Sequence, residues 1–203
     1  MSKIALRKLF KPAAVVAAAF SLVSLSATAQ ERQDPDLGIY VGASVGVGVA
    51  EWTSGSTTDR VNFSGKIFGG KRLTPGLAAE INYFQFGRLD KSNDAGRATA
   101  MGWSAISQKE TAWTIGINYE VELLHNFTNH LRAGWAFTRK RQMVTNANAS
   151  VTTREITYDT APYVGAGLSF EMMRNLRLTN GIDWIVNGKD SYYLLSFGLS
   201  QEF

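Results

Sequence analysis

The last twelve residues of the chain alternate between apolar and polar side chains. One set of alternate positions is apolar and consists of Tyr193, Leu195, Phe197, Leu199 and Phe203. The other set is small or polar and consists of Ser196, Gly198, Ser200 and Glu202. Because successive side chains of a strand point to opposite faces, this pattern predicts a β-strand whose apolar face runs to the final aromatic residue. Such a strand suits a wall that has lipid on one side and a hydrophilic interior on the other.

Seven earlier segments show the same alternation. The first, residues 39–49, has apolar residues at every second position from Ile39 to Val49, with glycine, serine and Tyr40 between them. A soluble sandwich would have solvated charges on that second face, whereas a small, uncharged face suits the crowded interior of a narrow barrel. The other segments are residues 61–73, 77–88, 108–119, 127–143, 160–171 and 176–186. Together with the last strand they predict an all-β chain, an eight-stranded antiparallel up-and-down transmembrane β-barrel.

The connections between the segments alternate in length, as in outer-membrane barrels, which have short turns at one end and longer loops at the other. Thr74-Pro75-Gly76 predicts a tight turn, and Asn187-Gly188 predicts another in the last hairpin. Longer polar loops are predicted at Arg88–Ser107 and Arg139–Asp159.

Outward-facing aromatic residues are expected at two levels, as in aromatic girdles. The level near the periplasm comprises Tyr119, Phe127, Phe170 and Phe203, and the higher level comprises Trp113, Trp135 and Trp184. Ordinary strand propensity would also place aromatic residues in strands, so the grouping supports a barrel without requiring one. Asn180 is the one polar residue that this register places outward near the middle of a strand, which suggests a local bulge or a register error.

The N-terminus has the pattern of a secretory signal. A basic region is formed by Lys3, Arg7, Lys8 and Lys11, and an apolar stretch runs from Ala13 to Leu25 before the cleavage motif Ala27-Thr28-Ala29. The stretch is short of the about 20 residues that cross a bilayer as a helix, which disfavours a retained anchor. We predict a signal peptide at residues 1–29, cleaved after Ala29, a short periplasmic segment at 30–37 and a barrel at 38–203.

Removal of that signal changes the charge balance. The full chain has 21 basic and 17 acidic residues, but four of the basic ones and none of the acidic ones lie in residues 1–29. The remaining charges cancel, so the basic pI does not indicate nucleic-acid binding. The absence of cysteine excludes disulfides, thiolate metal sites and thiol catalysis.

Several segments resemble known outer-membrane proteins. The C-terminal strand resembles the assembly signal of bacterial outer-membrane barrels, through Tyr193, Leu195, Phe197, Leu199 and Phe203, although Gln201 departs from that pattern. Residues 66–84, with Gly69-Gly70, Pro75, Glu80 and Tyr83, resemble the second and third strands of the OmpA-type transmembrane domain. Residues 162–170 and 195–203 are similar to its sixth and eighth strands. The chain is therefore identified as a small OmpX- or opacity-like member, a porin family protein with the barrel domain only.

The resemblance implies an interior charge network. In the family, an interior Glu on the third strand and an interior Arg gate a narrow water path, and Glu80 and Arg132 match them. The other matching positions, Ser169 and Thr179, are uncharged, so the network is not carried over intact. Glu80 is expected to pair inside the lumen with one of the cations Lys66, Arg72 or Arg132, because a lone buried charge is costly.

Enzymatic activity is not expected. Both histidines, His125 and His130, fall around the predicted periplasmic turn, at the wrong end for lipid of the outer leaflet. A nucleophile with a base in hydrogen-bond reach is not evident, and two histidines five residues apart without cysteine give no convincing metal site. We predict no catalytic, metal or cofactor site.

Three functions remain open at this point. The first is a monomeric structural or interaction barrel in the outer membrane, contacting lipid, lipopolysaccharide or host molecules through its loops and the barrel-assembly machinery through its last strand. The second is a small passive channel gated by interior charges. The third is a soluble calyx that binds an apolar ligand, which requires apolar residues inside and polar ones outside.

Overall fold

The computed structural model describes residues 38–203 except residues 51–56, 59–60, 125, 149–151 and 188–190. The predicted signal peptide, its cleavage site, the predicted segment 30–37 and Gly188 of the predicted last turn lie outside the described residues. The elements are β1 Ile39–Ala50, β2 Thr57–Thr58, β3 Val61–Thr74, β4 Leu77–Ser92, α3 Ala95–Met101, β5 Trp103–Leu124, β6 Phe127–Asn146, β7 Thr152–Met173, β8 Leu176–Ile185 and β9 Tyr192–Glu202.

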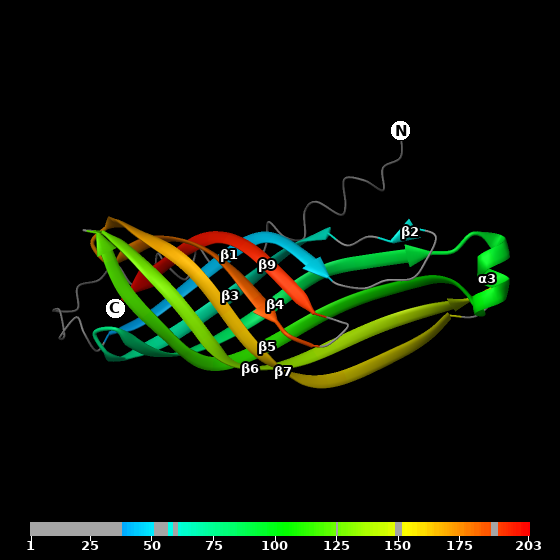
Figure 1. The fold of residues 1–203 in the computed structure, drawn as a ribbon, viewed down its shortest axis with the longest axis horizontal. Helices are drawn as coiled ribbons and strands as arrows, with labels where there is room; N and C mark the ends of the chain where they lie inside the picture. The colour runs from blue at the N-terminus through cyan, green and yellow to red at the C-terminus, as the bar shows by residue number, and fades with distance from the viewer. Residues whose placement is uncertain (1–37, 51–56, 59–60, 125, 149–151, 188–190) are drawn as a thin grey trace.

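Eight of these strands form a closed barrel (Figure 1). Each long strand pairs antiparallel with its neighbour in the chain, β1 pairs with β9, and β4 pairs with β5. The two-residue strand β2 adds to the outer end of β4 through Lys91 and Ser92. The prediction of an eight-stranded up-and-down antiparallel barrel is confirmed. In the described part of the chain, no helix has both the length and the apolar character needed to cross a membrane.

The apolar side chains lie on the outside of the barrel. Ile115 is 59% exposed, Phe63 57% and Leu195 59%, while Thr114, Ser64 and Ser196 beside them face inward and are buried. A soluble protein does not leave such a continuous apolar surface in water, and the arrangement is the reverse of a soluble calyx. The aromatic residues meet across strands as expected near the periplasmic end, where the rings of Phe127 and Phe170 are 4.9 Å apart.

The strands differ greatly in length. β5 and β7 have 22 residues each, whereas β8 has 10 and β9 has 11. The outer halves of β4 to β7 therefore project beyond the barrel as a sheet, with α3 at its tip (Figure 1). We call this the protruding sheet. It corrects the prediction of polar loops at Arg88–Ser107 and Arg139–Asp159. Strands β4 and β5 extend into the first segment, with α3 between them, and β6 and β7 extend into the second.

Local signals explain the ends of the elements. Asp94 caps α3 by accepting a hydrogen bond from the Arg97 backbone N–H at 2.9 Å, and Gly102 ends the helix with φ of 77°. The tight periplasmic turns contain Asn126 and Asn175, both with positive φ, a conformation that asparagine tolerates better than most residues. Pro75-Gly76 joins β3 to β4, as predicted.

Candidate functional site

The lumen contains charged residues at two levels, and the first lies near its middle. Lys66 on β3 and Arg132 on β6 both contact Asp183 on β8, with N–O distances of 2.5 and 2.7 Å. The side chains of Lys66, Arg132 and Asp183 are at most 8% exposed. Tyr163 donates a hydrogen bond to the same carboxylate at 2.6 Å. Asp183 is thus the centre of this middle cluster, and its carboxylate neutralises two cations, Lys66 and Arg132, which come from two distant strands.

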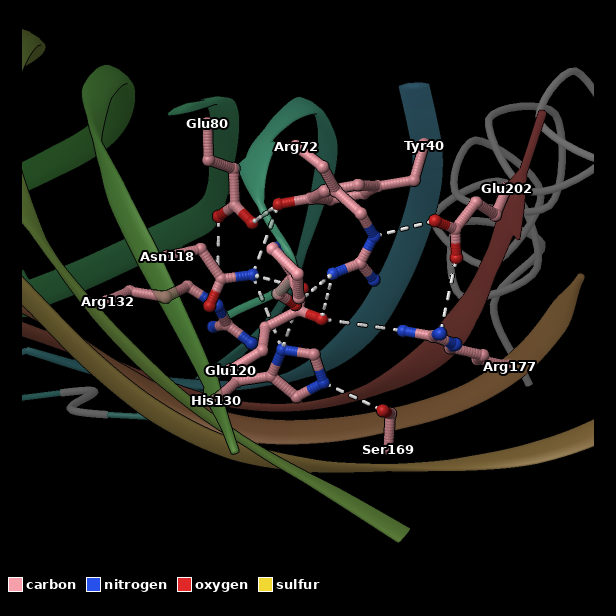
Figure 2. A network of polar contacts seen from close by, with 11 residues as sticks. Tyr40, Arg72, Glu80, Asn118, Glu120, His130, Arg132, Ser169, Arg177 and Glu202 are labelled. Carbon is pink, nitrogen blue, oxygen red and sulfur yellow. Dashed lines mark hydrogen bonds and ion pairs between the residues drawn. The ribbon is translucent and has the colours of Figure 1, made fainter. Parts of the chain in front are cut away.

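Glu80 forms the other side of the middle cluster. Its Oε1 lies 3.7 Å from Nε of Arg132, and its Oε2 accepts a hydrogen bond from Tyr40 at 2.7 Å (Figure 2). The structure thus brings together two of the residues singled out from the sequence, Glu80 and Arg132. It places Lys66 against Asp183. The sequence register predicted that Asp183 points inward, but Asp183 was not among the predicted site residues.

The second level is a ring of four residues near the periplasmic end, which we call the periplasmic ring. Arg72 lies 2.6 Å from both Glu120 and Glu202. Arg177 contacts the same two carboxylates at 3.5 and 3.2 Å. Each arginine therefore bridges both glutamates, across strands β3, β5, β8 and β9 (Figure 2). Arg72, a candidate partner for Glu80 from the sequence, belongs to this ring instead.

Polar side chains connect the two levels. Asn118 donates hydrogen bonds to Tyr40 and to Glu120, both at 3.1 Å. His130 lies 3.3 Å from Asn118 through Nδ1 and 2.7 Å from the Ser169 hydroxyl through Nε2 (Figure 2). The expectation that His130 belongs to the periplasmic turn is wrong. It is the fourth residue of β6 and faces the lumen, because the turn ends before Phe127.

The contact between Ser169 and His130 has the geometry of a nucleophile and its base, with Glu120 3.6 Å from the other ring nitrogen. Ser169 is only 2% exposed. The cavity between the two charged levels, lined by Glu80, Asn118 and His130 among others, measures about 20 Å³, which is room for about one water molecule. The contact therefore lies within the packed interior of the lumen, with little room for a substrate beside it. Among the described residues, no group of acidic and histidine side chains has a metal-binding arrangement.

Two glycines make room for Arg132. A Cβ at Gly167 would lie 2.3 Å from a backbone oxygen of the facing strand and 3.2 Å from Nη2 of Arg132. A Cβ at Gly181, directly opposite on β8, would lie 3.5 Å from the same nitrogen. The Arg132 guanidinium lies over this pair of glycines. Their lack of a side chain on the inner face of the barrel leaves the space that this large residue occupies.

The half of the lumen next to the protruding sheet contains a cluster of buried aromatic residues, beside the buried polar residues Gln108 and Glu110. Its aromatic residues, which we call the aromatic plug, are Phe84, Phe86, Tyr163 and Tyr192, with at most 2% exposed surface. The Phe84 and Phe86 rings stack with centroids 5.9 Å apart, and Phe86 lies 5.0 Å from Tyr192. Leu89, Ile106 and Leu194 complete this core. Sequence alternation placed Phe84 inward, but it did not reveal that the large aromatic residues gather in one half of the lumen.

The outward face of the protruding sheet is basic. Arg88, Lys109 and Arg141 stand directly opposite one another on β4, β5 and β6, and we call them the basic row. Arg139 and Arg154 flank it on the same face. Among these five cations, only Arg88 forms an ion pair with an acidic residue of the described chain, namely Asp90 at 2.8 Å. Like charges directly opposite on neighbouring strands repel one another and are destabilising.

The outer half of β7 forms an open edge in the described part of the chain. Residues 152–160 pair with β6 on one side, whereas pairing with β8 begins at Tyr163. All nine side chains are exposed, including Tyr158 at 71%. The last strand, by contrast, is paired on both sides, with Leu195, Phe197 and Phe203 outward and exposed and with Tyr193 and Leu199 partly covered.

Comparison with known proteins gives a family and a set of similar folds. Residues 34–193 match the family described as the OmpA-like transmembrane domain. No curated protein matches the chain. Neisserial surface protein A is similar in structure, with a TM-score of 0.59 and 18% identity over 81% of this chain and 97% of that one.

Two further solved structures share the fold. OprG from Pseudomonas aeruginosa has a TM-score of 0.59 and 9% identity, over 83% of this chain and 97% of that one. Ail from Yersinia pestis, solved in complex with the heparin analogue sucrose octasulfate, has a TM-score of 0.54 and 12% identity, over 82% of this chain and 99% of that one. At these identities the likeness concerns the fold.

Proposed function

Since this chain belongs to the family of OmpA-like transmembrane domains, which are outer-membrane barrels, we propose that it works as a structural and interaction barrel of the outer membrane. In this role the protruding sheet binds the phosphate groups of lipopolysaccharide. The observation that carries the proposal is the basic row of Arg88, Lys109 and Arg141 on the outward face.

The height of the basic row fits this partner. On β5, Lys109 lies four residues beyond Trp113, an exposed aromatic residue suited to the membrane interface. At about 3.3 Å per residue and a strand tilt of about 40°, this places the Lys109 backbone about 10 Å farther from the membrane centre. That is the depth of headgroup phosphates, for which arginine and lysine are the usual ligands.

Polyanion binding also has a precedent in the fold. Ail has been solved in complex with a sulfated sugar analogue. The likeness to Ail concerns the fold, so the proposal for this chain depends on its own cations. Envelope integrity follows as the consequence, because a protein that neutralises neighbouring phosphates links lipopolysaccharide molecules laterally.

The open edge of β7 supports a second kind of contact, with a host or partner protein. Nine consecutive residues there have backbone groups that, among the described residues, pair with a strand on one side only. An extended segment of another protein can pair with such an edge. Export with cleavage after Ala29, and delivery to the assembly machinery through the outward face of β9, are further parts of the proposal.

The two alternative functions have less support. A passive channel requires a continuous wet path, but the aromatic plug fills the upper lumen, and apolar constrictions block ions by excluding water. A soluble calyx requires the apolar residues inside, whereas most large apolar side chains here are exposed on the barrel surface.

The lipopolysaccharide proposal can be tested by thermal unfolding of the barrel in vesicles. We expect lipopolysaccharide to raise the melting temperature of the wild type, and enzymatically dephosphorylated lipopolysaccharide to raise it less. The double variant Lys109→Ala, Arg141→Ala should lose most of this gain. Lys71→Ala is the matched control, because Lys71 is an exposed outward cation at the periplasmic end. Equal shifts for all three proteins, or equal shifts for both lipids, would contradict the proposal.

A further inference from the structure

Asn180 faces the lipid near the middle of β8. The strand pairs in continuous register with β7 and β9 through this position, so the side chain is outward without any bulge. Its side chain is exposed, as are those of the outward neighbours Ile182 and Phe197. The explanation by a bulge or a register error, considered from the sequence, is therefore wrong.

The depth of Asn180 keeps its carboxamide away from water. It lies four residues from Leu176 and five from Ile185, the ends of β8. With a rise of about 3.3 Å per residue and a tilt of about 40°, it is about 10 Å or more from either end of the strand. Leu168 and Phe197 are its paired neighbours on the adjacent strands. The surrounding surface is thus apolar, and the depth corresponds to hydrocarbon.

The carboxamide has no partner within the described chain. No hydrogen bond to its side chain is formed by any described residue. A polar group left without hydrogen bonds in hydrocarbon is costly, and polar residues at such positions commonly join transmembrane elements to one another. The lipid ester groups lie at the interface and are too far from the middle of β8 to supply the missing bonds.

We propose that Asn180 is the centre of a contact between two copies of this chain within the membrane. A carboxamide has both donors and an acceptor, so two identical ones satisfy each other when related by a two-fold axis. A closed two-fold dimer brings the same surface patch of both copies together. The apolar residues around Asn180 exclude lipid and water from the pair, as the rim of a binding hot spot does.

The shape of the molecule favours this side for a dimer. β8 and β9 end near the barrel rim with 10 and 11 residues, whereas the protruding sheet rises from β4 to β7 (Figure 1). Two copies can therefore approach through β8 and β9 with the tips bearing α3 directed away from each other. Such a dimer would differ from the monomer expected from the sequence, and it would leave the basic row free for lipopolysaccharide.

The first test is sedimentation equilibrium of the refolded full chain in density-matched micelles. We expect a reversible monomer–dimer equilibrium for the wild type. Asn180→Leu should weaken dimerisation by about tenfold, because membrane hydrogen bonds are modest and two are lost per dimer. Gln85→Leu is the matched control, since Gln85 is an exposed polar residue of β4, on another wall of the barrel, and it should leave the dimer unchanged. Heat-modifiable gel mobility shows that each variant is folded.

The second test locates the contact in vesicles. The chain contains no cysteine, so Ile182→Cys and Ile115→Cys each introduce a single thiol on the outer surface. A short bifunctional thiol reagent should cross-link Ile182→Cys into a dimer, and adding Asn180→Leu should reduce the yield. Ile115→Cys, on β5, should remain monomeric.

Three outcomes would overturn the proposal. They are a monomeric wild type at every protein-to-lipid ratio, a dimer unaffected by Asn180→Leu, and cross-linking at position 115 but not at 182. A cross-link from position 182 to a different protein in native membranes would assign the site to that protein instead and would equally exclude the second copy.

Discussion

Arg72 and Glu202 meet at 2.6 Å across the seam between the first and last strands of the barrel. Arg72 is on β3 and Glu202 on β9, with β1 between them. The side-chain contact therefore passes over β1 inside the lumen and joins the two neighbours of that strand. It forms only when β1 has paired with both, so it stabilises the closed state of the barrel specifically.

Glu202→Ala should lower the free energy of unfolding by about 2 kcal/mol. Removing one member of a fully buried pair costs about 3–5 kcal/mol, and the loss is smaller here because the Glu202 side chain is 15% exposed. Unfolding by guanidinium chloride in vesicles, followed by tryptophan fluorescence, measures the change. Asp90→Ala is the control, because its pair with Arg88 is largely exposed, and it should change stability by less than about 1 kcal/mol. Similar losses for both variants would contradict a role of the ring in closure.

Asp183→Asn should destabilise the barrel more than any other single change in the lumen. It leaves the cations Lys66 and Arg132 buried without their shared carboxylate, and such a loss costs about 3–5 kcal/mol. Adding Lys66→Met should restore part of the stability, because one of the two uncompensated charges is removed. The same unfolding measurement gives the double-mutant cycle. If the two losses were simply additive, Lys66 and Asp183 would not be coupled.

Gly167→Ala should destabilise the wall beside Arg132. Its Cβ would lie 2.3 Å from the backbone oxygen of Asn180, and overpacking of this kind costs about 1–3 kcal/mol. Gly96→Ala in α3 is the matched control, since its Cβ meets nothing closer than 3.9 Å, and alanine favours a helix. That variant should be as stable as the wild type or slightly more stable. If Gly167→Ala left the stability of the barrel unchanged, the strands would separate easily at this point.

The wild type should be electrically silent in planar bilayers. The aromatic plug covers the charged half of the lumen, so Glu80→Ala and Arg132→Ala alone should remain silent as well. Replacing Phe84 and Phe86 by alanine in the Arg132→Ala background should produce measurable current, because both the plug and a bulky charge are then removed. Steady conductance of the wild type would support a channel and contradict a closed lumen.

The N-terminus of the protein isolated from outer membranes should be Gln30. This follows from the cleavage motif at Ala27-Thr28-Ala29, and intact mass measurement checks it directly. A protein that retains residues 1–29 would instead be anchored by its N-terminal segment.

The sequence alone determined which side chains form the outer face of the barrel wall and which form its inner face. Strand alternation has a period of two, so Phe197 and Ser196 fall on opposite faces whatever else the chain does. That local rule predicted the eight long strands and the inward direction of Glu80, Arg132 and Asp183, and the alternating connection lengths predicted their up-and-down order. It was insufficient for Arg88–Ser107 and Arg139–Asp159, since a strand with solvent on both faces can be as polar as a loop.

Tertiary structure alone decided which inward residues meet. Lys66 and Asp183 are 117 residues apart in the chain, and the choice between Glu80 and Asp183 as the partner of Lys66 depends on the stagger of strands around the closed barrel. The same stagger sets Arg72 beside Glu202 and separates the aromatic plug from the charged lower lumen. Periodicity gives the face of a strand on which a side chain lies, whereas its height and its partner across the lumen follow from the shear and closure of the whole sheet.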